Sequence, residues 1–99
     1  MAMTTVALSK PITAHGEEVS ELTFRKPTTE DVMELGLPQL VVVSEDGSPG
    51  VEVRTKVVGR YVARLAAIPA NSVKALTIRD FNQCISVVMG FFNEGDGEA

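Results

Sequence analysis

The sequence predicts an α+β fold in which an N-terminal antiparallel β-hairpin is followed by three or four α-helices. Residues 19–26 alternate in polarity after a turn that contains Gly16, and two later segments, 57–66 and 78–92, carry apolar side chains at helical spacing. The chain has 99 residues, which is the size of one small domain. We therefore expect a single α+β domain over residues 1–93.

The hairpin is expected over residues 4–26. Gly16 can adopt the positive φ of a tight turn, and the alternation beyond it directs Leu22 and Phe24 toward the inner face. Pro11 has no amide hydrogen, so it should lie at a strand end or on an edge where no ladder bond is lost. The rest of the domain, residues 28–92, is expected to be mainly helical.

A short helix is expected directly after Pro27. Thr28 and Asp31 have the spacing of a capping box, in which each side chain bonds the other residue's backbone N–H. Gly36 and Pro38 provide a helix stop and a helix breaker, so the helix should be about nine residues long.

Residues 40–53 allow two interpretations. The apolar run 40–43 and the Asp-Gly turn signal at 46–47 could form a second hairpin with residues 51–54, or the run could extend a helix into a mobile loop. No apolar side chain anchors residues 44–50. A mobile loop over these residues is therefore the favoured interpretation.

Helical spacing places the longest helices near residues 54–67 and 77–92, with a basic row on the first of them formed by Lys56, Arg60 and Arg64. The apolar stripe of the first helix is expected to contain Val57, Val58, Tyr61, Val62, Leu65 and Ala66. The stripe of the second is expected to contain Ile78, Phe81, Ile85, Val88 and Phe92, with Cys84, Val87 and Phe91 beside it.

Caps are expected at both ends of the segment between these helices. Asn71 should cap a short helix, and Thr77 and Asp80 repeat the Thr-x-x-Asp spacing of a capping box. Residues 94–99 are acidic and rich in glycine, so we expect a disordered tail.

The charge balance points to protein partners. Nine basic and thirteen acidic residues give a net charge of -4, without the Lys/Arg cluster that nucleic acid or an anionic membrane surface would need. No signal-peptide pattern and no apolar window of about 18 residues is present, so a cytoplasmic location is expected.

The residues suited to chemistry are few and isolated. His15 and Cys84 are the single histidine and cysteine, and neither has an evident third group to orient it, so a turn residue and a core residue are expected. The acidic pairs 17–18, 30–31 and 45–46 are explained by solvation and capping. We therefore expect a protein that is not an enzyme and has no cofactor or metal.

Two short segments could mark a binding surface. Arg25 and Lys26 end a strand directly before a capped helix, although an exposed strand end is the favoured interpretation. Phe91 and Phe92 would ordinarily be core residues, but they lie in the last turn of the last helix beside the tail, where an exposed patch would indicate binding.

The order of these features resembles the small tail assembly chaperones of contractile-tailed bacteriophages, of the Mu-like or E type. The resemblance covers about residues 6–92 and includes the segments 8–12 and 22–28 with Asp31. Its C-terminal part consists of Ile68, Pro69, Val73, Leu76, Thr77, Asp80, Phe81, Val88, Phe91 and Phe92.

The resemblance implies a helper in the host cytoplasm that binds the long, apolar tape-measure protein, with tail-tube subunits as further partners, and is absent from the mature virion. Members of such families are often made in two forms, and ribosomal slippage near the codons of Phe91 and Phe92 would produce the longer one.

The partner-binding residues are expected where apolar side chains adjoin flexible segments and have the weakest claim on the core. These residues are Leu37, Leu40, Val41, Val42, Phe91 and Phe92. The alternative is a small structural tail or baseplate subunit that assembles through the edge of its hairpin, and self-association is open in either case.

Overall fold

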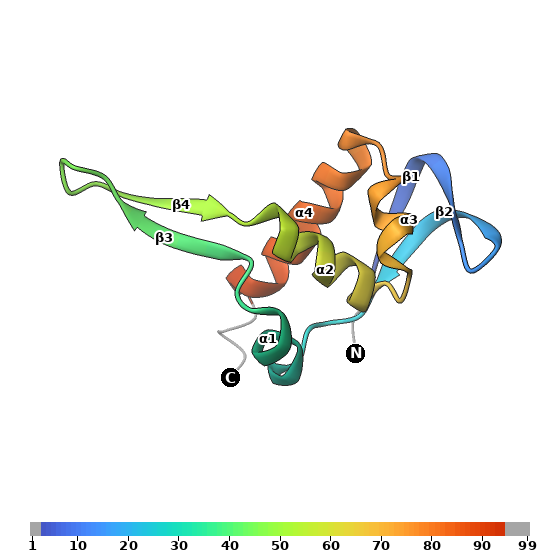
Figure 1. The fold of residues 1–99 in the computed structure, drawn as a ribbon, viewed down its shortest axis with the longest axis horizontal. Helices are drawn as coiled ribbons and strands as arrows, with labels where there is room; N and C mark the ends of the chain where they lie inside the picture. The colour runs from blue at the N-terminus through green and yellow to red at the C-terminus, as the bar shows by residue number, and fades with distance from the viewer. Residues whose placement is uncertain (1–2, 95–99) are drawn as a thin grey trace.

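The first hairpin is present as the sequence predicts. The computed structural model describes residues 3–94, and it begins with β1 (Thr4–Ala14) paired antiparallel with β2 (Glu17–Phe24) (Figure 1). His15 and Gly16 form the turn with φ of 55° and 78°, the two positive values of a type I′ turn. This confirms the turn predicted at Gly16.

The inner face of this hairpin is buried. Leu22 is 2% exposed and Phe24 0%, as the alternation predicts, and Val6 and Ile12 are buried with them. The register of the pairing shifts between Ala7 and Ile12. Pro11 lies within this irregular stretch rather than at a strand end, and the interruption of the ladder accommodates its missing N–H.

The first helix has the predicted cap. α1 (Thr29–Leu35) begins with the Asp31 N–H donating to Thr28 Oγ1 at 3.3 Å and the Thr28 N–H donating to Asp31 Oδ2 at 2.8 Å. The helix has seven residues rather than about nine, because Gly36 leaves the helical conformation with φ of 87°.

A second hairpin replaces the loop that the sequence favours. β3 (Gln39–Val43) and β4 (Pro49–Val53) pair antiparallel, so the loop interpretation is wrong and the hairpin alternative is correct. The polar residues between them bond to one another: the Asp46 carboxylate accepts from the Ser44 hydroxyl and, at 2.9 Å, from the Ser48 N–H. The turn therefore needs no apolar anchor.

This second hairpin, residues 39–53, projects from the body of the molecule and is called the arm below. Figure 1 shows it as a long ribbon leaving the helices, and the longest dimension of the chain is 49 Å. It forms a separate two-stranded sheet and shares no ladder with β1 or β2.

Three further helices follow within the described residues: α2 (Thr55–Leu65), α3 (Ala70–Lys74) and α4 (Ile78–Glu94). The two long helices lie where predicted. The expected Asn71 cap is wrong, because Pro69 is the N-cap and accepts from the Ser72 N–H at 3.0 Å, which places Asn71 inside α3. Residues 95–99 of the predicted tail lie outside the described residues.

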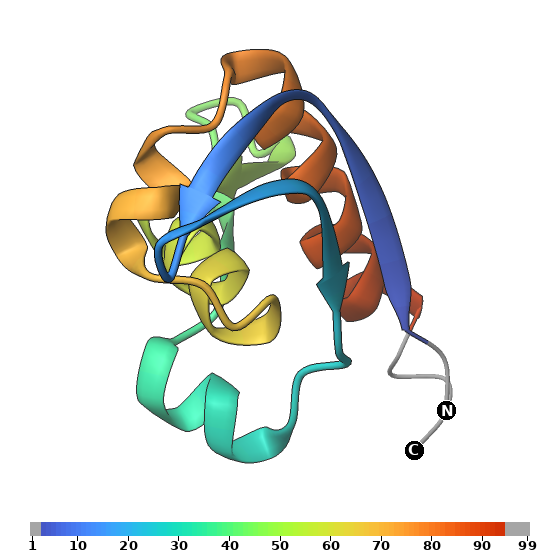
Figure 2. The same ribbon diagram turned by 90° about the vertical axis from the view of Figure 1, so that its right-hand side faces the viewer.

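Helix α4 buries a narrower stripe than its sequence suggests. Cys84 and Val88 are fully buried, whereas Ile78, predicted on the apolar face, is the first residue of α4 and is 80% exposed. The core is one cluster, and Figure 2 shows the first hairpin arching over the helices. Its fully buried members include Phe24, Val58, Tyr61, Val62, Cys84 and Val88.

Asp80 does not close a reciprocal capping box. Its N–H donates to Thr77 Oγ1 at 3.1 Å, but its carboxylate accepts from the Ser9 N–H at 2.9 and 3.0 Å and from the Lys10 N–H at 3.3 Å. These bonds satisfy the backbone that the irregular stretch of β1 leaves without a strand partner and lower the pKa of Asp80. α4 is thereby fastened to the first hairpin.

Candidate interaction surface

The base of the arm is held by α2. The Tyr61 hydroxyl donates to the Gly36 carbonyl oxygen at 2.6 Å, and the Arg54 N–H donates to the Pro38 carbonyl oxygen at 2.8 Å. Pro38 is fully buried, yet Leu37 beside it is 52% exposed. The segment between α1 and β3 is therefore fixed with one apolar side chain pointing to solvent.

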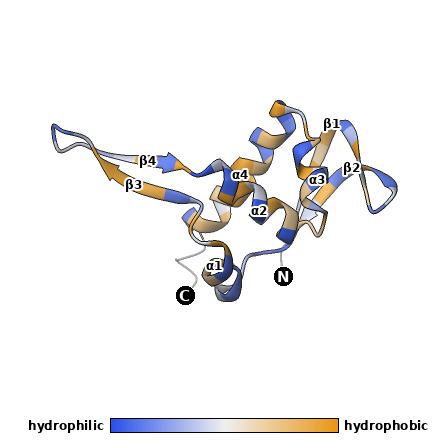
Figure 3. Ribbon diagram, in the orientation of Figure 1, coloured by the Kyte–Doolittle hydropathy of each residue, from blue (hydrophilic) through white to orange (hydrophobic). Residues whose placement is uncertain are grey.

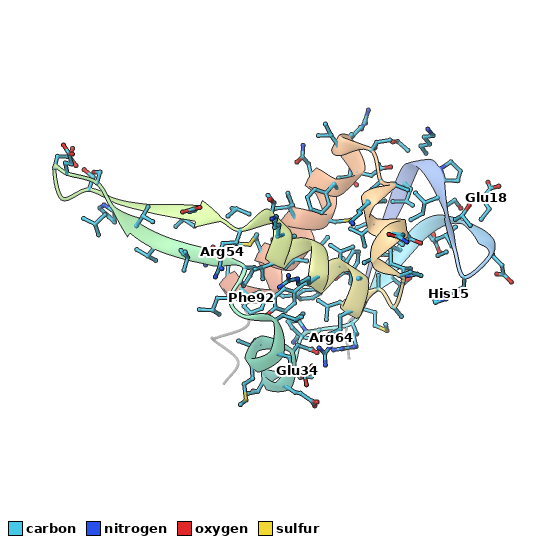
Figure 4. The ribbon with its side chains drawn as sticks, in the orientation of Figure 1. His15, Glu18, Glu34, Arg54, Arg64 and Phe92 are labelled. Carbon is cyan, nitrogen blue, oxygen red and sulfur yellow. The ribbon has the colours of Figure 1, made fainter. Side chains whose placement is uncertain are left out.

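Tyr61 also contacts the end of α4. Its ring meets that of Phe92 edge-on, with centroids 5.3 Å apart and an interplanar angle of 77°. Phe91 and Phe92 are half-buried and pack against the core, so their share in the core is larger than the sequence suggests. The reason is that α4 continues to Glu94. Figure 4 shows Phe92 on the side from which the arm leaves.

Tyr61 thus joins two parts of the predicted binding set that are far apart in sequence. Through Gly36 it contacts the segment that carries Leu37, and through its ring it contacts Phe92. The apolar stripe of residues 57–66 identified Tyr61 as a core residue. Its bridging role depends on a hydroxyl bond to a residue 25 positions away, which helical spacing does not indicate.

The other predicted residues lie on the arm and are exposed. Leu40 is 42% exposed, Val41 72% and Val42 43%. Cross-strand partners point to the same side of a ladder, so Leu40 and Val42 share a face with Glu52, and Val41 lies on the opposite face with Val51. The predicted set is therefore divided between the two faces of the arm, its base and the end of α4.

A buried carboxylate fastens the end of the first hairpin. Asp31 is 2% exposed and pairs with Arg25 and Arg64, each with an N–O distance of 2.8 Å, and Arg64 also pairs with Glu34 at 2.6 Å (Figure 4). The hydrogen bond from Arg25 holds the pKa of Asp31 well below its usual range, and the pKa of Arg25 is raised in turn. Arg25 thus belongs to an ion-pair cluster and is more than an exposed strand end.

A cavity of about 570 Å³ lies between α2, α3 and the start of α4. The apolar part of its lining includes Val73, Leu76 and Phe81, and the cations Lys56, Arg60 and Lys74 line it as well. Helical spacing in the sequence identifies the basic row of α2 but not the cavity, because Lys74 and Phe81 line the cavity from other helices.

The surroundings of the single cysteine and the single histidine are those of a core residue and a turn residue. Cys84 is fully buried, and burial raises the pKa of its thiol to about 11, which keeps it neutral. His15 is exposed in the turn, and its Nε2 donates to the Ala67 carbonyl oxygen at 3.1 Å. Within residues 3–94, no three His, Cys, Asp or Glu side chains gather as a metal site would require, and no helix is long and apolar enough to cross a membrane.

A small α+β body that exposes apolar side chains on a projecting arm is typical of proteins that act by contacting other proteins. The family model described as "Phage tail assembly chaperone proteins, E, or 41 or 14" matches residues 5–93. The chain belongs to this family of phage tail assembly chaperones, which confirms the resemblance found in the sequence. No curated protein and no solved structure matches it.

Proposed function

We propose that this tail assembly chaperone binds the tape-measure protein and keeps that long, apolar, helical protein soluble until the tail tube polymerises. The observation that supports the proposal is the exposure of Leu37, Leu40 and Val42, apolar side chains on and beside the arm. An amphipathic helix is bound by such a surface through its apolar face. Tail-tube subunits, whose contacts would have the same chemistry, are further partners in the proposal.

The proposal places this activity in the host cytoplasm, before the virion is complete, and involves no catalytic step. It also includes a longer form made by ribosomal slippage near Phe91 and Phe92. These residues lie inside α4, so an extension would begin from the last helix, beside the base of the arm. A gene with neither a slippery run nor an overlapping frame would exclude the longer form.

One observation favours a second candidate, a structural tail or baseplate subunit. Within the described part of the chain, β1 and β2 pair with no third strand, so the first hairpin, through which this candidate would assemble, keeps outer edges that could accept one. β3 and β4 keep outer edges in the same way. The two candidates differ in a simple readout. A structural subunit remains in purified particles, whereas a chaperone is absent from them.

The test is co-expression with the tape-measure protein of the same gene cluster, followed by pull-down and measurement of that partner's solubility. We expect specific co-purification and rescue of a partner that is otherwise insoluble. If solubility is the same with and without this chain and nothing co-purifies, the proposal is wrong.

Leu40→Asp tests the surface itself. It places a charge on a 42% exposed side chain, so we expect partner recovery to fall on the order of tenfold while the free energy of unfolding changes by no more than about 0.5 kcal/mol. Met33→Asp is the matched control, because Met33 is an 81% exposed apolar residue on α1. Phe92→Asp separates these effects less well, since Phe92 packs on Tyr61. Equal losses of partner recovery in Leu40→Asp and Met33→Asp would exclude the arm as the binding surface.

A further inference from the structure

The arm has an apolar face that nothing in the described chain covers. The ladder pairs Val41 with Val51 and places Val43 and Val53 on the same side, and these four residues are called the valine face below. Their exposed fractions are 72% for Val41, 67% for Val43, 60% for Val51 and 39% for Val53. The hydropathy colouring of Figure 3 shows this apolar character along β3.

An isolated two-stranded hairpin is only marginally stable in water, because it has too little buried apolar area. The first hairpin solves this problem by packing on the helices, but every residue from Leu40 to Val53 is exposed. The arm is held at its base by the bond from Arg54 to Pro38, and the valine face remains open to a second surface.

Charge is distributed unequally along the arm. Its tip carries Glu45 and Asp46, and no basic residue lies between residues 39 and 53. Basic residues begin at the base with Arg54, which Figure 4 places where the arm meets the body, and continue with Lys56. No ion pair is formed by either cation within the described residues. The tip therefore carries two negative charges, whereas at the base the two positive charges of Arg54 and Lys56 exceed the single negative charge of Glu52.

We propose that two copies of this chain form a dimer by packing their valine faces together with the arms antiparallel. A two-fold axis at the Val41–Val51 pair makes the contact identical for both copies. Val51 lies three residues before Arg54, and Val41 lies four residues before Glu45, so both ends are roughly 10–13 Å from the axis. The acidic tip of each arm then lies against the basic base of the other.

Charge selects this arrangement over the parallel one. With the arms parallel, the two tips would place Glu45 and Asp46 of one copy beside the same residues of the other, and like charges in contact are unfavourable. The valine face itself carries no charge, so a second copy meets no unpaired charged group there. The dimer does not depend on which tail protein the chaperone binds.

The size of the contact sets the affinity to expect. A standard interface uses about 20–30 residues from each partner, whereas the arm has only 15 residues and contributes one of its two faces. We therefore expect a dissociation constant in the micromolar range. The measurement is sedimentation velocity of the full chain over a range that reaches several hundred micromolar. A chain that remains monomeric at the highest concentration overturns the proposal.

The valine face is tested by Val51→Asp, with Val42→Asp as the control. Both substitutions put one negative charge on an exposed valine of the arm, but Val42 lies on the opposite face. We expect Val51→Asp to weaken dimerisation about tenfold or more and Val42→Asp to change it much less. Equal effects, or no effect of either, would assign the dimer to another surface and overturn the proposal.

The antiparallel arrangement is tested by charge exchange. Glu45→Arg and Arg54→Glu should each weaken the dimer several-fold, and the double variant should recover it, because each tip again meets an opposite charge in the partner. The two positions are at opposite ends of the arm, so recovery cannot arise within one chain. Failure of the double variant to recover dimerisation excludes the antiparallel pairing.

Discussion

The two hairpins of this molecule have the same local structure and opposite surroundings. β1 and β2 arch over the helices and bury Leu22 and Phe24, whereas β3 and β4 project from the body and bury none of their residues. Both turns contain a glycine with positive φ, Gly16 at 78° and Gly47 at 88°. Turn chemistry therefore makes a hairpin but does not decide where it packs.

What differs is the pattern of side chains along the strands. From Glu21 to Phe24 in β2, polar and apolar residues alternate, so one face is suited to the core and the other to water. In β3, Leu40 to Val43 are apolar on both faces, which gives no single inner face. The first pattern stabilises the monomer, and the second leaves apolar area for other chains.

The largest expected difference between the hairpins is in their contribution to stability. Phe24 is 0% exposed, so Phe24→Ala should lower the free energy of unfolding by about 3–5 kcal/mol. Val41 is 72% exposed, so Val41→Ala should change it by about 0.5 kcal/mol or less. Urea unfolding at a concentration where the chain is monomeric measures both.

Phe24→Leu is a milder variant for the case in which Phe24→Ala does not fold, and its expected cost is about 1–1.5 kcal/mol. The comparison fails if the Val41 and Phe24 substitutions have similar effects. That result would mean that the arm packs on the body in solution and contributes to the monomer's core.

The ion pairs of Asp31 are the next largest expected effect, because they fasten the end of β2 to α1 and α2. Asp31→Asn should lower the free energy of unfolding by about 2 kcal/mol at neutral pH, less than for a fully buried pair, since Arg25 and Arg64 are partly exposed. The native pKa of Asp31 lies below its unfolded value, so its contribution is complete above about pH 4 and is lost as the pH falls further.

Urea titrations of both proteins at pH 7 and pH 3 measure this. The difference between wild type and Asp31→Asn should shrink at the lower pH. Glu34→Gln is the matched control, because Glu34 pairs with the same Arg64 but is 52% exposed, and its effect should stay within about 0.5 kcal/mol. A difference that does not depend on pH would show that the Asp31 charge is not what stabilises the cluster.

Much of the fold can be predicted from this sequence because its signals are local. The alternation beyond Gly16, the Thr28 and Asp31 capping box, and the helical stripes each predict an element that the structure contains. The arm could not be predicted with the same certainty, and the cause is physical. Its valines favour a strand, but periodicity identifies a strand most clearly when one face is buried, and here neither face is.

The contacts that join the elements to one another, including those at the candidate surface, are not local and could not be predicted in the same way. Asp80 has the spacing of a cap, yet its carboxylate bonds the backbone of Ser9, 71 positions away. Tyr61 occupies a core stripe, yet it joins Gly36 to Phe92. Such bonds depend on how elements pack, so the sequence identifies the apolar residues of the surface but not their division between two faces of the arm.

The smallest expected effect shows whether each hairpin unfolds together with the helices. Gly16→Ala and Gly47→Ala each force a residue with Cβ into a left-handed conformation, at a local cost of about 1 kcal/mol. At Gly16 the cost should appear in global unfolding, because the first hairpin belongs to the core. At Gly47 it should appear as faster amide exchange in β3 and β4 of the monomer with the urea midpoint unchanged, because the arm can open while the helices stay folded. A lowered midpoint in Gly47→Ala would show that the arm and the body unfold together.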